Sequence, residues 1–235
     1  MRLDVFCTQK GFVDSRNKAQ ELIKKGLIKV NDKICKKASF EVSNEKIELL
    51  QSCIFVSRAG EKLWSFLLDF TLDFENKSAL DIGSSTGGFT QVLLKCGIKK
   101  VDCVDVGSEQ LHKSLRQNPK ISLFENTDIR DFKSEEKFDF VLCDVSFITL
   151  ENILPVILHF AKDKIILLFK PQFEVGKDVK RNKKGVVKDE KKIQETLQKT
   201  LDLLMQKDLE ILCVEKSKIK GKEGNEEFFI ACAKH

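Results

Sequence analysis

The 235-residue sequence lacks several features, and each absence removes a class of protein. Its eight cysteines contain no CxxC pair and its three histidines lie far apart, so no metal site with zinc-ligand spacing is expected. Several cysteines fall in apolar runs, which favours free thiols in the reducing cytoplasm over a disulfide framework. Asp4 interrupts the stretch that a signal peptide keeps apolar, and the longest apolar run, Ile165 to Phe169, cannot span a bilayer. A soluble cytoplasmic protein without stable membrane insertion is therefore expected.

The net charge of +5 is concentrated at one end of the chain. Residues 1–60 hold 12 Lys and Arg against 7 Asp and Glu, so the other 175 residues sum to zero. A concentrated basic surface favours a polyanionic partner such as nucleic acid. An ordinary solvated lysine surface is the alternative.

Residues 1–54 predict a small α+β domain. Apolar residues recur at helical spacing from Ser15 to Lys25, Asp14 or Ser15 can cap this helix, and Gly26 can end it. Short strands are predicted over 27–30, 33–35 and 46–50. The basic side chains on this helix and hairpin are candidate RNA ligands: Arg16, Lys18, Lys24, Lys25, Lys29, Lys33, Lys36 and Lys37.

Residues 55–235 change to strands alternating with helices, which predicts an α/β domain with a mostly parallel sheet. The expected strands cover 78–82, 100–104, 121–125, 138–143 and 164–169. The expected helices cover 60–69, 89–96, 108–117, 149–161 and 189–206. A final pair of strands, 210–215 and 227–233, is expected to close the sheet in antiparallel orientation.

A glycine-containing loop follows the first of these strands, where a backbone must approach a ligand. The loop lacks the GxGxxG spacing that seats a pyrophosphate, because an acid precedes its first glycine and Ser84 occupies no glycine position. A cofactor without a pyrophosphate is favoured, and S-adenosylmethionine fits, since it offers a cationic methionine end and two free ribose hydroxyls. The candidate cofactor ligands here are Asp81, Gly83, Ser84, Ser85, Thr86, Gly87, Gly88 and Phe89.

Acidic residues also stand at the ends of the next strands. Asp105, next to Val106, is the expected ribose ligand because a carboxylate can accept hydrogen bonds from both ribose hydroxyls. Asn126 and Asp128 would frame the adenine edge, and Asp144 would lie beside the transferred methyl group. Each acid alone could be a helix cap. Acids at four successive strand ends favour a ligand site, because ligands of open α/β sheets gather there.

With these motifs the sequence resembles the TlyA family of ribosomal RNA 2'-O-methyltransferases, sometimes labelled haemolysin A, over nearly its whole length. The resemblance is carried by Arg2-Leu3-Asp4, Ser15-Arg16 through Val30-Asn31, Ser57 to Leu63, Leu80 to Thr90, and Lys170 to Glu174. It implies an S4-like RNA-binding domain over 1–54, with Arg2 and Arg58 as further RNA ligands. It implies an FtsJ-like domain over 55–235 with a Rossmann-like class I methyltransferase fold, whose seven-stranded, mostly parallel sheet ends in an antiparallel strand.

The resemblance also implies a catalytic tetrad of Lys62, Asp144, Lys170 and Glu227, with the neighbouring Glu226 as the alternative fourth member. The substrate it implies is a cytidine of ribosomal RNA or of a ribosomal subunit, and the short family type favours 23S over 16S rRNA. The chain departs from many relatives at Ser108, where a tyrosine commonly stands, so the local adenine contact stays open. The oligomeric state is not predicted.

A ribose 2'-hydroxyl is a poor nucleophile at neutral pH, so methyl transfer requires a base, an in-line pose, or both. No histidine is placed for this role, and Lys170 is the candidate base. Two basic runs, 177–192 and 216–222, are expected to bind RNA phosphates, with a plain solvated loop as the alternative.

Three other functions stay open. A base methyltransferase is one, because Asp144 to Phe147 faintly resembles the acidic-Pro-Pro-aromatic loop of amino-group methylases, although both prolines are missing. Cytosine C5 chemistry would need a cysteine, and Cys143 would face away from Asp144 if the strand continues through both. A membrane-active haemolysin and a non-catalytic ribosome assembly factor are the others.

Overall fold

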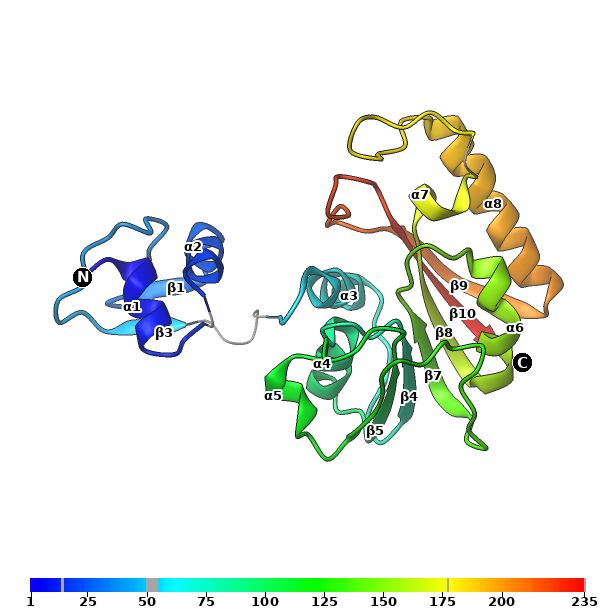
Figure 1. The fold of residues 1–235 in the computed structure, drawn as a ribbon, viewed down its shortest axis with the longest axis horizontal. Helices are drawn as coiled ribbons and strands as arrows, with labels where there is room; N and C mark the ends of the chain where they lie inside the picture. The colour runs from blue at the N-terminus through cyan, green and yellow to red at the C-terminus, as the bar shows by residue number, and fades with distance from the viewer. Residues whose placement is uncertain (14, 50–54, 177, 235) are drawn as a thin grey trace. The chain divides into compact units, whose positions relative to one another are not determined.

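The computed structural model describes residues 1–13, 15–49, 55–176 and 178–234. The chain divides into two compact units, Met1–Ile54 and Phe55–His235 (Figure 1). The described residues form one hydrophobic core in the first unit and two in the second. The units are called unit 1 and unit 2 below.

Unit 1 packs two helices on a three-stranded antiparallel sheet. The helices are α1 (Leu3–Gln9) and α2 (Arg16–Lys24), and the sheet has the order β2 (Lys33–Ile34), β1 (Ile28–Val30), β3 (Ile47–Leu49). The Ser15 side chain accepts the Lys18 backbone N–H and caps α2, whereas Asp14 lies outside the described residues. The sequence predicted α2 but missed α1, because α1 has seven residues and only two buried apolar positions.

Unit 2 is built on one seven-stranded sheet of order β6-β5-β4-β7-β8-β10-β9. The first five strands are parallel, and β10 pairs antiparallel with both β8 and β9. This confirms the predicted α/β fold with its antiparallel closing pair. The strands are β4 (Ser78–Ile82), β5 (Lys100–Val104), β6 (Ile121–Phe124), β7 (Phe138–Cys143), β8 (Ala161–Phe169), β9 (Leu209–Lys216) and β10 (Phe228–Lys234).

Helices cover both faces of this sheet (Figure 1). One core contains residues of α3 (Arg58–Asp69) and α4 (Gly88–Lys95), and the other contains residues of α6 (Leu150–Phe160) and α8 (Glu190–Gln206). Two helices are short, α5 (Lys113–Arg116) and α7 (Pro171–Glu174). The predicted helix over 108–117 is wrong for its first half. There the Gln110 side chain bonds Ser85 and its N–H bonds Glu125, which holds the chain in a loop.

The order of the strands determines where a ligand can bind. The chain runs outward from β4 to β5 and β6 and then returns to β7 on the other side of β4. Ile82 of β4 therefore lies opposite Cys143 of β7, and the Asp144 N–H donates to the Ile82 carbonyl at 3.0 Å. Ligands of open α/β sheets bind at such a switch point, outside the carboxyl ends of the strands.

Candidate active site

Asp81 lies at the centre of this sheet edge and is completely buried. One of its oxygens, Oδ2, accepts hydrogen bonds from the Thr90 N–H at 3.0 Å and the Thr90 hydroxyl at 2.5 Å. Among the described residues, its Oδ1 and the nearby Ser84 Oγ are buried without a hydrogen-bond partner. Desolvation raises the pKa of Asp81 to about 7. A buried carboxylate oxygen without a partner is what a cationic ligand group requires.

Asp105 connects the first two strand ends. Its carboxylate accepts the backbone N–H of Ser85 at 2.8 Å and of Gly107 at 2.7 Å, which fixes the loop after β4 against the loop after β5. Gly83 is required here on two grounds: its φ is +79°, and a Cβ would come within 2.9 Å of the Asp144 carbonyl oxygen.

Two neighbouring cavities, which share lining residues, lie at this edge. The first, which we call the outer cleft, has a volume of about 940 Å³ and includes Asp105, Asp128 and Phe147 in its wall. The second, which we call the lysine pocket, has a volume of about 390 Å³ and includes Lys62 and Lys170. Both are lined by Gly83, Ser85, Asp144 and Ser146.

Two lysine–carboxylate pairs stand at the lysine pocket. Lys62 of α3 contacts Glu227 with 2.5 Å between Nζ and Oε2, and both side chains are buried. Lys170, after β8, contacts Asp144 with 2.6 Å between Nζ and Oδ1 and donates to the Ser146 hydroxyl at 3.1 Å. Burial raises the pKa of Asp144, and the charge of Lys170 opposes that rise. All four predicted tetrad members thus meet at one sheet edge.

Glu226 lies elsewhere. Its carboxylate pairs with Lys216 at 2.6 Å and with Lys220 at 3.3 Å, whereas Glu227 faces Lys62 and also accepts from the Gln172 side chain at 3.5 Å. The geometry therefore favours Glu227 over Glu226 as the carboxylate that contacts the lysine pocket. Sequence reasoning missed Ser146 and Gln172, although Gln172 stands inside the motif that carries the family resemblance.

The predicted cofactor ligands divide into two groups. Those that line a cavity are Asp81, Gly83, Ser84, Ser85, Thr86, Phe89, Asp105, Val106, Asp128 and Asp144. Three predicted ligands line neither the outer cleft nor the lysine pocket: Gly87, Gly88 and Asn126. The structure does not bring Asn126 to the outer cleft, where Thr127 and Ile129 form the wall instead. Asp128 pairs with Arg130 at 2.6 Å, which lowers its pKa to about 2.

Cys143 cannot serve as a nucleophile for base methylation. It is fully buried in the core, and desolvation raises the pKa of its thiol to about 12. A thiol must be deprotonated to attack, so cytosine C5 chemistry at this residue is excluded.

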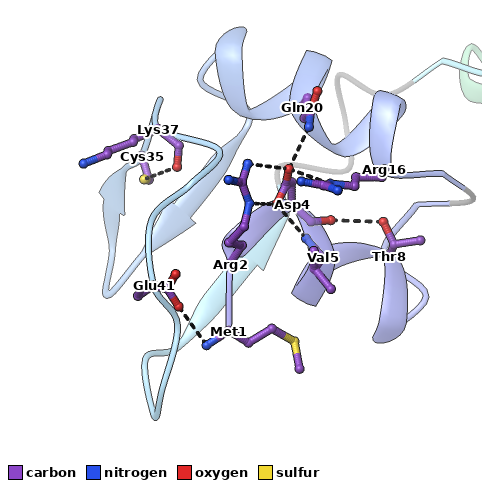
Figure 2. A network of polar contacts seen from close by, with 10 residues as sticks. All are labelled: Met1, Arg2, Asp4, Val5, Thr8, Arg16, Gln20, Cys35, Lys37 and Glu41. Carbon is purple, nitrogen blue, oxygen red and sulfur yellow. Dashed lines mark hydrogen bonds and ion pairs between the residues drawn. The ribbon is translucent and has the colours of Figure 1, made fainter.

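Two of the predicted RNA ligands of unit 1, Arg2 and Arg16, contact a buried carboxylate, that of Asp4 (Figure 2). Asp4 is inaccessible to solvent, and it accepts hydrogen bonds from Arg2, Arg16 and Gln20 at 2.7 to 3.0 Å. The Arg2 guanidinium is the largest cause that holds the pKa of Asp4 far below its usual range. The two arginine side chains remain about half exposed. They are therefore fixed in direction yet available to a ligand.

The lysines of unit 1 differ in their pairing. Lys18 and Lys25 pair with Glu21. Among the described residues no ion pair involves the other predicted ligands, Lys24, Lys29, Lys33, Lys36 and Lys37. These unpaired lysines are the ones best able to bind phosphate.

The two basic runs of unit 2 differ in how far they are engaged within the protein. Most lysines of the run 216–222 are paired. In the run 177–192, Lys177 lies outside the described residues, Lys192 pairs with Glu195, and no ion pair within the described chain involves Lys180, Lys183, Lys184, Lys188 or Lys191. Arg181 donates to the backbone carbonyls of Gln172, Gly176 and Val179 and so closes its own loop. Lys218 pairs with Asp69 of α3, and Lys216 and Lys220 pair with Glu226. Lys222 differs, because it lines the lysine pocket. Within the described part of the chain, no helix has the length and apolar character needed to cross a bilayer.

The chain matches two family models. Residues 55–234 match the model described as FtsJ-like methyltransferase, and residues 1–46 match that of the S4 domain. Three similar proteins cover nearly the whole chain. The 23S rRNA (cytidine-2'-O)-methyltransferase TlyA of Campylobacter jejuni is 47% identical, over 97% of this chain and 98% of its own. The 16S/23S rRNA (cytidine-2'-O)-methyltransferase TlyA of Mycobacterium tuberculosis is 33% identical, over 97% and 88%. A solved hemolysin-labelled structure from Streptococcus thermophilus is 32% identical with a TM-score of 0.73, over 100% and 88%.

Proposed function

The chain belongs to the FtsJ-like methyltransferase family, and from this membership we propose that it methylates the 2'-hydroxyl of a cytidine in ribosomal RNA, with S-adenosylmethionine as donor. The observation that carries the proposal is the meeting of the pairs Lys62–Glu227 and Lys170–Asp144 beside the loop after β4. The S4 match and the basic surface of unit 1 support RNA as the substrate. The Campylobacter relative, which the match covers over 98% of its length, favours 23S rRNA. Free cysteines support the cytoplasm as its compartment.

The residues at the sheet edge fit this cofactor. The unpartnered Asp81 Oδ1 and Ser84 Oγ can bind the ammonium and carboxylate of a methionine end. Asp105 lines the outer cleft, where a carboxylate can accept hydrogen bonds from two ribose hydroxyls. The acids Asp81, Asp105 and Asp144 also supply negative potential for a sulfonium ion.

When bound, S-adenosylmethionine supplies an electrophilic methyl group. The protein must present the 2'-oxygen in line with that group and remove its proton as the new bond forms. Lys170 can hold the hydroxyl because Asp144 and Ser146 fix the direction of its side chain. Lys62, fixed by Glu227, provides a second cation at the same pocket, which stabilises negative charge that develops on the oxygen.

The decisive experiment maps ribose methylation on ribosomal RNA from cells with and without this gene. A 2'-O-methylated nucleotide resists alkaline cleavage, so a resistant dinucleotide should be present only where the gene is intact. A gene-dependent methylated base would exclude ribose chemistry. An unchanged set of modifications, together with no binding of S-adenosylmethionine by calorimetry, would identify a non-catalytic assembly factor.

A further inference from the structure

The loop between β9 and β10 is held in a defined shape at the lysine pocket. The Ser217 N–H donates to the Glu227 carbonyl at 2.8 Å, and the Gly221 N–H donates to the Asn225 carbonyl at 2.8 Å. Asn225 is buried and accepts the Val187 N–H at 3.0 Å. These contacts fix the backbone from which the side chains of this loop project. The loop leads directly into Glu227.

Four lysines alternate along this segment, and three are neutralised. Lys216 and Lys220 share Glu226, and Lys218 pairs with Asp69. Lys222 lines the lysine pocket together with Lys62 and Lys170. Within the described residues, it makes no ion pair and no hydrogen bond through its side chain.

The charges around the pocket are unequally matched. Glu227 neutralises Lys62, and Asp144 neutralises Lys170. Arg58, at the start of α3, also lines the pocket, and its guanidinium donates to the Lys220 carbonyl, an uncharged acceptor. Arg58 and Lys222 are thus the two cations of the described pocket wall without a carboxylate partner. Two cations without a carboxylate partner therefore stand beside the two lysine–carboxylate pairs, in a pocket wall that also contains the buried Asp81.

We propose that Lys222 binds the phosphate on the 3' side of the target ribose; this rests on the proposed function. The 2'-hydroxyl and the 3'-phosphate occupy neighbouring carbons of one ribose, so a hydroxyl presented to Lys170 brings that phosphate to the same pocket. A phosphate contact fixes the register of a nucleic acid without reading its sequence. Lys222 is therefore a substrate-positioning residue, and Arg58 supports it through the loop carbonyl.

The test compares Lys222→Met, Lys222→Arg and Lys99→Met in the full chain. Lys99 is also an exposed lysine and lies before β5, at the opposite edge of the sheet, so its variant removes one charge away from the site. Methylation of ribosomal RNA is measured at several salt concentrations, and binding of S-adenosylmethionine is measured by calorimetry. Lys222→Met should raise KM about tenfold, keep kcat within about twofold, and reduce the slope of log(kcat/KM) against log[salt] by about 0.7 to 0.9.

Lys222→Arg should recover most of the affinity because it retains the charge. Cofactor affinity should be the same in all variants. If Lys222→Met matches Lys99→Met in KM and salt slope, or lowers kcat alone, the assignment of Lys222 is wrong while the proposed function stands. If the wild-type protein does not methylate ribosomal RNA, the proposed function fails, and the assignment fails with it.

Discussion

In the proposed reaction Lys170 is the residue on which the chemistry depends most directly, and its pairing with Asp144 allows two roles. As a base it would take the proton of the 2'-hydroxyl, and as a fixed cation it would orient the ribose. Lys170→Ala should keep both ligands bound yet reduce turnover about 100-fold or more, the usual size of a general-base contribution. Lys170→Arg keeps the charge but cannot accept a proton at neutral pH.

Single-turnover methylation at saturating cofactor distinguishes the two roles of Lys170. An arginine variant nearly as inactive as the alanine variant identifies a base, and a largely recovered rate identifies a positioning cation. Wild-type turnover in Lys170→Ala would remove Lys170 from the active site altogether.

The raised pKa of Asp81 predicts that cofactor binding depends on pH. Its pKa of about 7 in the free protein, caused chiefly by desolvation, means that the carboxylate form decreases about tenfold per pH unit below 7. The cationic methionine end binds the carboxylate form of Asp81. The affinity for S-adenosylmethionine should therefore decrease as the pH is lowered from about 6.5 to about 5.5, with a slope that approaches tenfold per pH unit. Calorimetry across this range measures it. Asp81→Asn should bind weakly with a flatter profile, and a pH-independent wild type would contradict the proposed contact.

The sequence could not decide between Glu226 and Glu227. Adjacent side chains entering a strand point in opposite directions, and only the pairing of β10 with β8 and β9 determines which one faces the pocket. That Lys62 and Lys170 lie at the same pocket could be expected from the sequence, because the motifs that carry the family resemblance surround them. Ser146 was missed because its role depends on a contact with Lys170, 24 residues further along the chain.

Among the secondary-structure elements, α3 and α4 show how packing positions a site residue. The helices meet at two glycines, and a Cβ at Gly60 would come within 2.9 Å of both the Gly88 carbonyl oxygen and the Phe55 Cβ. Gly60→Ala should displace α3 and with it Lys62. We expect about 1 to 3 kcal/mol of destabilisation and at least a tenfold loss of turnover.

Thermal unfolding and turnover of Gly60→Ala should be compared with those of Leu68→Ala. Leu68 belongs to the same helix but is 66% exposed, so its truncation should change both quantities little. A Gly60→Ala protein with wild-type stability and activity would show that α3 tolerates the displacement. The strands were predictable to within a few residues from their apolar runs, whereas α7 was missed because four residues carry no periodicity.

At the scale of the whole molecule, charge and chemistry are divided between the two units. Residues 1–54 hold 11 Lys and Arg against 7 Asp and Glu, whereas residues 55–235 hold 30 against 29. The sequence predicted this division and the fold of both units. It could not predict which lysines are neutralised, because the partners Glu21, Asp69 and Glu226 are recognisable only in the folded chain.

The division of charge predicts that unit 1 contributes RNA affinity without affecting the cofactor. In the full chain, Lys24, Lys33 and Lys36 are replaced together by Gln, since all three are exposed and unpaired among the described residues. The matched control replaces Lys77, Lys99 and Lys207, which are exposed at the amino-terminal edge of the unit 2 sheet. The first variant should bind S-adenosylmethionine normally, raise KM for ribosomal RNA, and reduce the log–log salt slope by about 0.7 for each phosphate contact that is lost. Equal effects of the two triple variants would mean that RNA responds only to net charge, and unit 1 would then not be the RNA-binding surface.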